Sequence, residues 1–426
     1  MNQDTGRRSG LRQAGLFFLL AVIVSYWKHE HELDSFLRNG SDSLGYYQWL
    51  PALLIEGRLD AMPWTYVLEN GQGLSLFNMG VALLQLPFFL IGHAWALVSG
   101  AEANGWSAPY AVAQFAAAAF YLALGCLFVF RALRRYHDER TALWTTTMLY
   151  LGTNLFYYAS FEPGMSHVYA FFLFALLWWL TEKWIAGPSP ALLIGLSAVL
   201  ALIVLVRPLN ACAALLPLFY RTHGLRDVTA RLRPILSMRY ALAVSIAVVL
   251  LFFIPQMMYW RTITGHWLTF TYGTKGESFD FRSPHILDIL VSHQNGWFIY
   301  TPLMLPVLLV LIFQARKAGT GARTILVVWS IAWYLYGSWW AWWLGGAFGY
   351  RGFLEYTALL ALPLATIVQW ALRLPLFWRR AFIGLAGFII FLNVRLSIIY
   401  MSPWDGPDWT WARCGHEMER ALFLVK

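Results

Sequence analysis

Apolar runs of roughly 17–25 residues, separated by short polar stretches, recur along nearly the whole chain. Each run is long enough to cross a bilayer as a helix, and backbone groups in lipid must hydrogen-bond within their own segment. The pattern predicts an all-α polytopic integral membrane protein with about eleven transmembrane helices in one domain, residues 1–426. The predicted spans begin near Leu11, Pro109, Thr141, Ser166, Ala191, Leu209, Tyr240, Trp297, Arg323, Phe353 and Ala381.

Composition and charge agree with this pattern. Of the 426 residues, 59% are hydrophobic and 12% are charged, whereas a soluble domain has about 25% charged residues. The net charge of +9 does not indicate a nucleic-acid partner, because the Arg and Lys residues lie in short clusters between apolar runs, as they do in cytoplasmic loops. We therefore expect membrane lipids, and no nucleic acid, as partners.

The basic clusters predict the orientation of the chain. They include 131–140, 221–239, 316–323 and 373–380, besides the N-terminal arginines. Placing them in the cytoplasm puts the N-terminus inside and the C-terminus outside. We expect a multi-pass protein of the bacterial inner (plasma) membrane whose active site faces the periplasm or exterior.

This orientation sorts the polar segments. We expect a first external loop at 28–108, a short external turn at 161–164, a long external loop at 261–296 and an external tail at 402–426. The apolar run Val81–Val98 does not fit, because a crossing there would place the cluster 131–140 outside. We interpret it as a membrane-associated helix that dips into or lies along the outer leaflet, the alternative being a twelfth span.

The first external loop contains a candidate catalytic carboxylate, Asp42. A carboxylate at a membrane surface can accept a proton from an attacking hydroxyl. Tyr46 and Tyr47 beside it could orient a sugar or a phosphate. The alternative is that Asp42 only caps the helix that follows, since Asp and Ser are favoured at helix N-termini.

The external turn carries a second candidate pair, Glu162 and His167. Ionisable residues at membrane depth are costly, which favours a functional role. The alternative is a solvated turn in front of a helix.

Four basic residues on the external side could bind an anionic lipid headgroup: Arg207, Lys275, His293 and Arg351. Arg binds phosphate in a bidentate manner and Lys acts as a point charge. The alternatives are snorkelling to the interface or pairing with nearby carboxylates. The sequence shows no metal-binding motif, so we expect neither a metal nor another cofactor.

In order, spacing and sidedness these features resemble the C-type (GT-C) glycosyltransferase superfamily, which includes bacterial aminoarabinose transferases and protein O-mannosyltransferases. Asp42 lies where that superfamily carries an acidic motif, often Asp-Glu; here Ser43 follows, so only the first carboxylate agrees. Glu162-Pro163 resembles the second acidic position, and Arg207 lies where aminoarabinose transferases place a basic residue.

The resemblance implies hexosyl or pentosyl transfer from a polyprenyl-phosphate sugar, such as one on undecaprenyl phosphate. The acceptor would be a glycan, a lipid or a protein. Asp42 would be the general base of an inverting attack, and Glu162 would orient the acceptor or share that role. Three other functions stay open: a flippase for lipid-linked sugars, an O-antigen ligase or polymerase-like enzyme with a diphosphate donor, and a non-catalytic scaffold.

Overall fold

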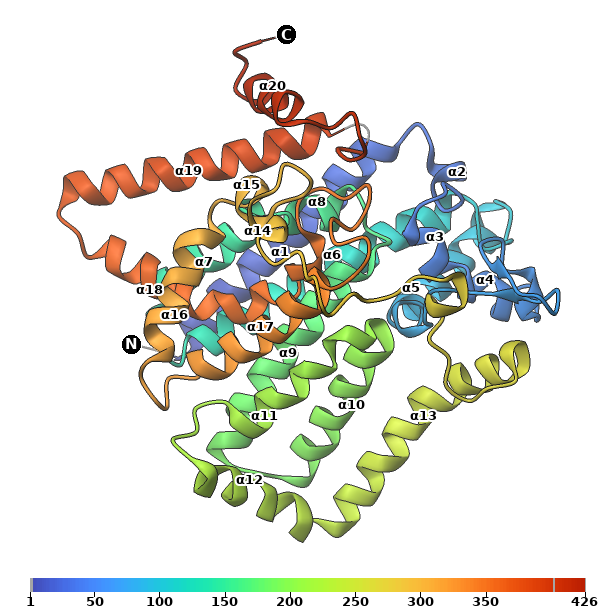
Figure 1. Cartoon of the computed structure of the whole chain (residues 1–426), viewed down its shortest axis with the longest axis horizontal. Helices are drawn as coiled ribbons and strands as arrows, with labels where there is room; N and C mark the ends of the chain where they lie inside the picture. The colour runs from blue at the N-terminus through green and yellow to red at the C-terminus, as the bar shows by residue number, and fades with distance from the viewer. Residues whose placement is uncertain (1–2, 401–402, 426) are drawn as a thin grey trace.

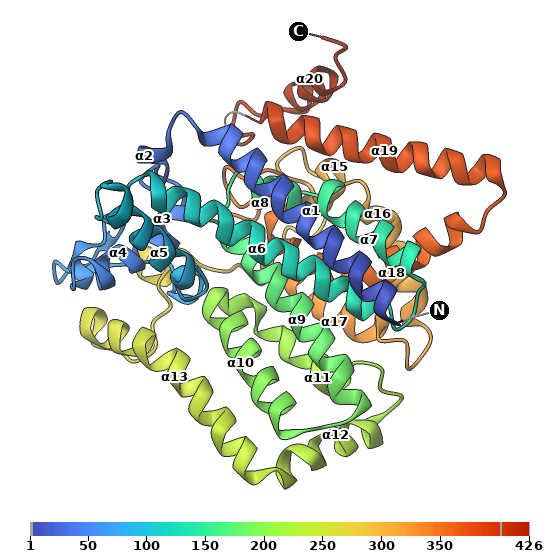
Figure 2. The ribbon, with the colours of Figure 1, turned by 180° about the vertical axis from the view of Figure 1, so that it is seen from behind.

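The computed structural model describes residues 3–400 and 403–425, so that residues 402 and 426 of the predicted tail lie outside the described part. The chain is helical almost throughout (Figures 1 and 2). Among the described residues, the strands β1 (Tyr66–Val67) and β2 (Gly73–Leu74) pair antiparallel in the loop 28–108, which the sequence predicts to be external. The fold is thus all-α, as the apolar runs predict.

The longer helices are α1 (Gln3–His29), α5 (Gly80–Ser99), α6 (Ala108–Leu133), α7 (Glu139–Leu151), α9 (Ser166–Ala186), α10 (Pro190–Val206), α12 (Leu225–Ser237), α13 (Arg239–Thr264), α16 (Met304–Ala315), α17 (Ala322–Gly337), α18 (Thr357–Leu372), α19 (Leu376–Ile399) and α20 (Trp411–Ala421). Most of them follow the predicted apolar runs, whereas α12 lies in the basic cluster 221–239 and α20 in the predicted tail 402–426. The shorter ones are α2 (Leu33–Phe36), α3 (Asp42–Tyr47), α4 (Trp49–Leu54), η1 (Leu59–Ala61), α8 (Leu155–Ser160), η2 (Pro208–Ala214), α11 (Leu215–Phe219), η3 (Gly273–Lys275), α14 (Asp288–Val291), α15 (Trp297–Tyr300) and η4 (Arg351–Phe353).

Among the described residues, six helices are long and apolar enough to cross a membrane: α1, α5, α6, α9, α13 and α19. Four shorter apolar segments accompany them, at Pro190–Val206, Pro208–Phe219, Met304–Ala315 and Thr357–Leu372. The predicted total of about eleven spans stays a prediction.

Two predicted spans are interrupted at prolines. The run predicted from Leu209 is part of the 3₁₀ helix η2, which starts at Pro208, and continues as the five-residue helix α11. The run from Trp297 stops after α15, and α16 starts only after Thr301-Pro302. Proline lacks a backbone N–H and restricts the residue before it, so each break lies where the helical hydrogen bonding is interrupted.

Helix α5 covers the run Val81–Val98. Its start lies against the end of α10, since a Cβ on Gly80 would approach the Val206 nitrogen to 2.5 Å. Further along, the His93 ring lies 2.6 Å from the Tyr110 hydroxyl near the start of α6. In Figure 1 α5 is seen nearly end-on, whereas α1 and α6 run across the view. This arrangement favours a helix that lies along one surface, and its relation to the membrane stays a prediction.

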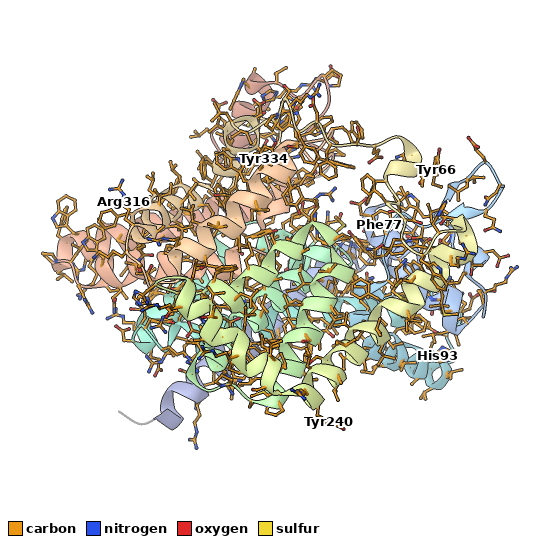
Figure 3. The ribbon with its side chains drawn as sticks, turned by 60° about the horizontal axis from the view of Figure 1, so that its bottom comes forward. Tyr66, Phe77, His93, Tyr240, Arg316 and Tyr334 are labelled. Carbon is orange, nitrogen blue, oxygen red and sulfur yellow. The ribbon has the colours of Figure 1, made fainter. Side chains whose placement is uncertain are left out.

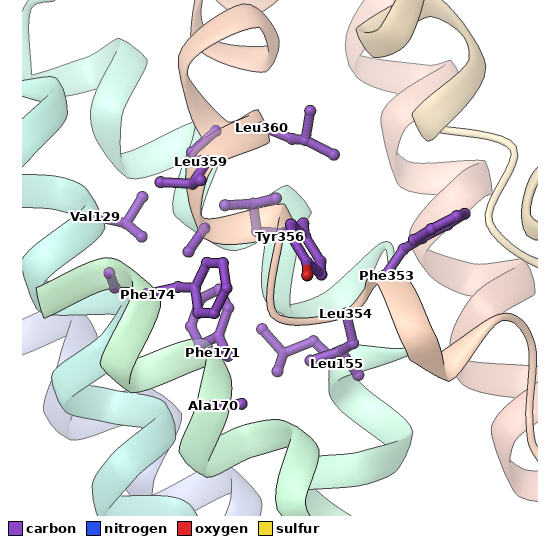
Figure 4. Packing of buried hydrophobic residues seen from close by; sticks show 14 of the residues in the cluster. Val129, Leu155, Ala170, Phe171, Phe174, Phe353, Leu354, Tyr356, Leu359 and Leu360 are labelled. Carbon is purple, nitrogen blue, oxygen red and sulfur yellow. The ribbon is translucent and has the colours of Figure 1, made fainter. Parts of the chain in front are cut away.

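The core is a layer of interlocking aromatic and aliphatic side chains on α6, α9 and α18. Figure 4 shows Tyr356, just before α18, facing Phe174 of α9; their ring centroids are 4.9 Å apart in an edge-to-face arrangement. Both residues are buried. This packing holds the segment that precedes α18 against α9.

The two longest polar segments dock onto the bundle. In the first loop, the Ser75 N–H donates to the Tyr259 hydroxyl (2.7 Å) and the Met79 N–H donates to the Gln256 side chain (2.9 Å), both on α13. The long loop after α13 runs beside the end of α17, where the Asp280 N–H donates to the Ser338 carbonyl (2.6 Å). These bonds bring both loops over the same end of the helices, which we call the site end.

Candidate active site

Ionisable side chains gather at the site end from three separate regions of the sequence. Asp42 is the first residue of α3, Glu162 lies in the turn between α8 and α9, and Arg351 begins η4. The Asp42 carboxylate and the Arg351 guanidinium form a salt bridge of 3.0 Å. The site therefore depends on tertiary packing rather than on a local motif.

Asp42 does not cap its own helix. Ser41 is the N-cap of α3, and its side chain accepts a hydrogen bond from the Ser43 N–H at 3.3 Å. The Asp42 carboxylate is left to pair with Arg351 and keeps 35% of its side-chain surface exposed. A carboxylate that is both positioned and accessible can contact a substrate.

Arg351 is held by a strained loop. One of its guanidinium nitrogens donates to the Leu344 carbonyl at 2.9 Å, and Leu344 has a positive φ of 61°. The Asn295 side chain donates to the carbonyls of Trp343 (2.8 Å) and Gly345 (3.0 Å) on either side. Unusual backbone conformations persist where surrounding contacts impose them, often at functional sites. Asn295 thus positions Arg351 through this loop.

Glu162 lies against α3, the helix that begins with Asp42. The Ser43 hydroxyl donates to the Glu162 carboxylate at 3.5 Å. The turn can come this close because residue 164 is glycine: a Cβ there would lie 2.7 Å from the Ser43 Cβ. Burial raises the pKa of Glu162 to about 7, with the Asp42 charge adding to the rise and Arg351 opposing it. Asp42 and Glu162 are therefore carboxylates in unlike environments, a pattern typical of acid–base sites.

The raised pKa predicts a pH-dependent stability. The pKa of Glu162 is about 7 in the folded protein and about 4.3 in the unfolded chain. Protonated Glu162 therefore contributes its full stabilisation of the folded state below about pH 4.3, and this contribution is lost as the pH rises through 7. Glu162→Gln cannot ionise. The melting temperature of this variant minus that of wild type should therefore be larger at pH 8 than at pH 5, as measured by thermal unfolding in detergent. The exposed Glu56→Gln serves as control; an equal difference at both pH values would contradict the assignment.

Gly164→Ala tests the approach of the turn to α3. The new methyl would lie 2.7 Å from the Ser43 Cβ and 3.0 Å from the Gln114 Oε1, so α3 or the turn must shift. Displacement of a catalytic group by about 1 Å can cost roughly a hundredfold in rate. If the site transfers sugars, as the resemblance to glycosyltransferases implies, the rate at which labelled sugar moves to an acceptor should fall by that order, and Gly187→Ala, which meets no atom within 4 Å, should leave the rate unchanged. Equal rates for both variants would argue against the close approach.

A second cluster surrounds Arg207 at the end of α10. One guanidinium nitrogen lies 2.8 Å from the Nδ1 of His167, and Nε lies 3.6 Å from the Glu355 carboxylate. Glu355 is completely buried and also accepts from the Asn210 side chain at 2.9 Å. Burial alone would raise the pKa of Glu355, but Arg207 and His167 hold it below its ordinary value. Glu355 is thus an ionised partner that orients Arg207.

Tyr46 and Tyr272 join the two clusters. Burial raises the pKa of Tyr46, while Arg207 and Arg351 lower it and Asp42 raises it. The same three charged groups act on Tyr272 in the long loop, whose pKa burial also raises. Both phenols therefore lie within electrostatic reach of Asp42 and of both arginines. Nothing in the sequence around Tyr272 singles it out, because only the folding of the long loop brings it there.

Three predicted binding residues lie apart from this cluster. The Tyr47 hydroxyl donates to the Gly105 carbonyl at 2.7 Å within the packing of the first loop. Lys275 is half-exposed and pairs with Glu277 at 3.0 Å. The His293 ring packs on Trp411 with centroids 5.2 Å apart. None of these contacts involves Asp42, Glu162, Arg207 or Arg351.

Within residues 3–400 and 403–425, no group of three or more His, Cys, Asp or Glu side chains is arranged to hold a metal ion.

Comparisons with known proteins give a likeness to solved structures alone. No family model and no curated protein matches the sequence. Among solved structures, the chain is similar to the Archaeoglobus fulgidus oligosaccharyltransferase in its apo form, with 12% identity and a TM-score of 0.45. The alignment covers 95% of this chain and 56% of that one, so the chain spans about half the length of that enzyme. The functional conclusion therefore rests on the site.

Proposed function

We propose that this protein is a membrane glycosyltransferase that moves a sugar from a polyprenyl-phosphate donor to an acceptor hydroxyl at the extracytoplasmic face, with inversion at the anomeric carbon. One observation carries this function: the accessible Asp42 and the carboxylate of Glu162 lie beside Arg351, within electrostatic reach of Arg207. Acid–base groups and cations for a phosphate occur together in one site.

Asp42 is the general base in this proposal. It takes the proton of the acceptor hydroxyl while the hydroxyl oxygen forms a bond to the anomeric carbon. The bond between that carbon and the phosphate oxygen breaks, and its electron pair leaves with the lipid phosphate. Glu162, with a pKa near 7, shares the base role or orients the acceptor, since a base near the working pH transfers protons efficiently.

Arg207 and Arg351 stabilise the leaving phosphate. Arg351 is largely shielded, with 18% of its side chain exposed, and Arg207 keeps 15%. Fixed cations that face a developing negative charge away from water lower the barrier more than exposed cations do. The His167 ring fixes one edge of the Arg207 guanidinium at 2.8 Å. Tyr46 and Tyr272, between these charges, contact the phosphate or the sugar.

A flippase for lipid-linked sugars would need the two arginines but no base. The placement of the accessible Asp42 and of Glu162 beside the arginines favours transfer, because transfer has an acceptor proton to remove and a flippase has none.

The test uses purified protein in lipid, undecaprenyl-phosphate sugars labelled in the sugar, and a membrane extract as acceptor. Label should move to the acceptor and free undecaprenyl phosphate should form in equal amount. The matching undecaprenyl-diphosphate sugars should give no product. Transfer from the diphosphate donor alone would replace this function by that of a ligase or polymerase, and lipid binding without transfer from any donor would favour a flippase or scaffold.

A further inference from the structure

A cavity lies at the end of the helices remote from the candidate active site. It encloses about 710 Å³ and is lined by the ends of α16 and α18 together with Tyr136, His137 and Arg221. Trp370 lies thirteen residues along α18 from Thr357, which at 1.5 Å per helical residue is roughly 20 Å, and Glu355 lies two residues before Thr357. In Figure 3 Arg316 marks this end of α16, far from Tyr334 near the site end of α17. We call this end the basic end.

We propose that this cavity binds one anionic phospholipid, with the phosphate at Arg221 and Lys317 and the acyl chains along α16 and α18. This site is separate from the glycosyl-transfer site and does not depend on it. No Asp or Glu occurs among the described residues that line the cavity, so its charge suits an anion.

The polar part of the cavity holds a pre-oriented guanidinium. Arg221 has a positive φ of 60° and donates to the Tyr136 hydroxyl at 3.1 Å. Its Nε donates to the Gly319 carbonyl at 3.4 Å, and a guanidinium nitrogen lies 3.8 Å from the buried Glu182 carboxylate. An arginine fixed in this way loses little conformational freedom when it binds phosphate. Lys317 adds a second, more mobile cation on the cavity wall.

The apolar part favours a lipid over free phosphate. Val310, Phe313, Leu362 and Trp370 line it, and Phe313 and Trp370 each expose 62% of their surface. Apolar rings exposed on helices of a membrane protein face lipid rather than water. The cavity therefore opens sideways, so that acyl chains can enter while the headgroup stays at the cations.

The neighbouring helix α12 indicates that a lipid surface lies at this depth. Leu225 and Leu236 lie on one helix face and are 81% and 67% exposed, while Arg226 and Arg233 lie beside them. A short helix with exposed leucines and flanking arginines is typical of the interface of an anionic membrane. Headgroups at the level of α12 are therefore within reach of Arg221, four residues before its start.

Binding to delipidated full-length protein in detergent tests the site. Short-chain phosphatidylglycerol should bind at least about tenfold more tightly than phosphatidylcholine with the same chains. Lys317→Gln should weaken phosphatidylglycerol binding about fivefold or more, and Val310→Trp should do so by filling the cavity without a charge change. Arg380→Gln, which removes an exposed charge on α19, should stay within about twofold.

Two results would overturn the inference. Equal affinity for the two lipids, or no binding of either, would show that the cations do not recognise a headgroup. Competition by inorganic phosphate at the same concentration as the lipid, together with unchanged binding to Val310→Trp, would identify a phosphate site instead. Because Arg221 also pairs with Glu182, the variants avoid it and keep that buried pair intact.

Discussion

Asp42→Asn should lower the turnover number for sugar transfer by roughly 10²–10⁴-fold, the range that general-base catalysis contributes. Donor binding should be unchanged or tighter. The reason lies in the 3.0 Å salt bridge: the Asp42 carboxylate competes with a phosphate for Arg351, and a neutral amide competes less. The measurements are initial rates at several donor concentrations, which separate kcat from KM.

Asp60→Asn provides the matched control. Asp60 lies in the same loop, and its side chain is 73% exposed and paired only loosely with Arg58 at 3.5 Å. It should transfer at the wild-type rate. If Asp42→Asn instead raised KM at an unchanged kcat, Asp42 would be a binding residue and Glu162 would become the candidate base.

The pH profile separates the two carboxylates. The pKa of Glu162 lies near 7. If the reaction requires Glu162 in its ionised form, kcat/KM should rise with pH through this range. The rise should disappear in Glu162→Gln. If the rise persisted in that variant, another group would control it and Glu162 would act only in orienting the acceptor.

Much of the helical framework follows from the sequence, because a bilayer requires long apolar runs with internally bonded backbones. Helices start close to Pro109, Ser166 and Tyr240, where the apolar runs start. Lengths are less predictable where proline interrupts a run, as at Pro302, which separates α15 from α16.

The site is only partly predictable for a different reason. The orientation predicted from the basic clusters puts Asp42, Glu162, Arg207 and Arg351 on one side of the membrane. The structure brings these four residues together. Sidedness cannot distinguish them from Lys275, which shares that side but pairs locally with Glu277. A charge pattern carries no information on how a loop folds back.

The supporting residues escape prediction altogether. Tyr272 reaches the site only because the long loop packs beside α17. Asn295 acts through two carbonyl groups about fifty residues further along the chain. Both effects depend on tertiary contacts between distant segments, for which a single sequence has no periodicity to read.

Arg207→Gln should cost about 3–5 kcal/mol of folding stability, because it leaves the buried Glu355 carboxylate without its cation. The same variant should lower transfer by roughly 10²–10³-fold, as expected when a group that stabilises developing charge is lost. The double variant Arg207→Gln/Glu355→Gln removes both charges and keeps an acceptor for Asn210, so most of the stability should return. Thermal unfolding and transfer rates are measured on the same preparations.

The double variant distinguishes a structural pair from a functional cation. If Arg207 only neutralised Glu355, removing both charges would restore transfer along with stability. If Arg207 binds the leaving phosphate, the double variant is stable but stays as slow as the single one. Arg282→Gln, which removes an exposed cation of the long loop after α13, should change neither quantity. Recovery of transfer in the double variant would therefore leave Arg351 as the cation on which the leaving phosphate depends.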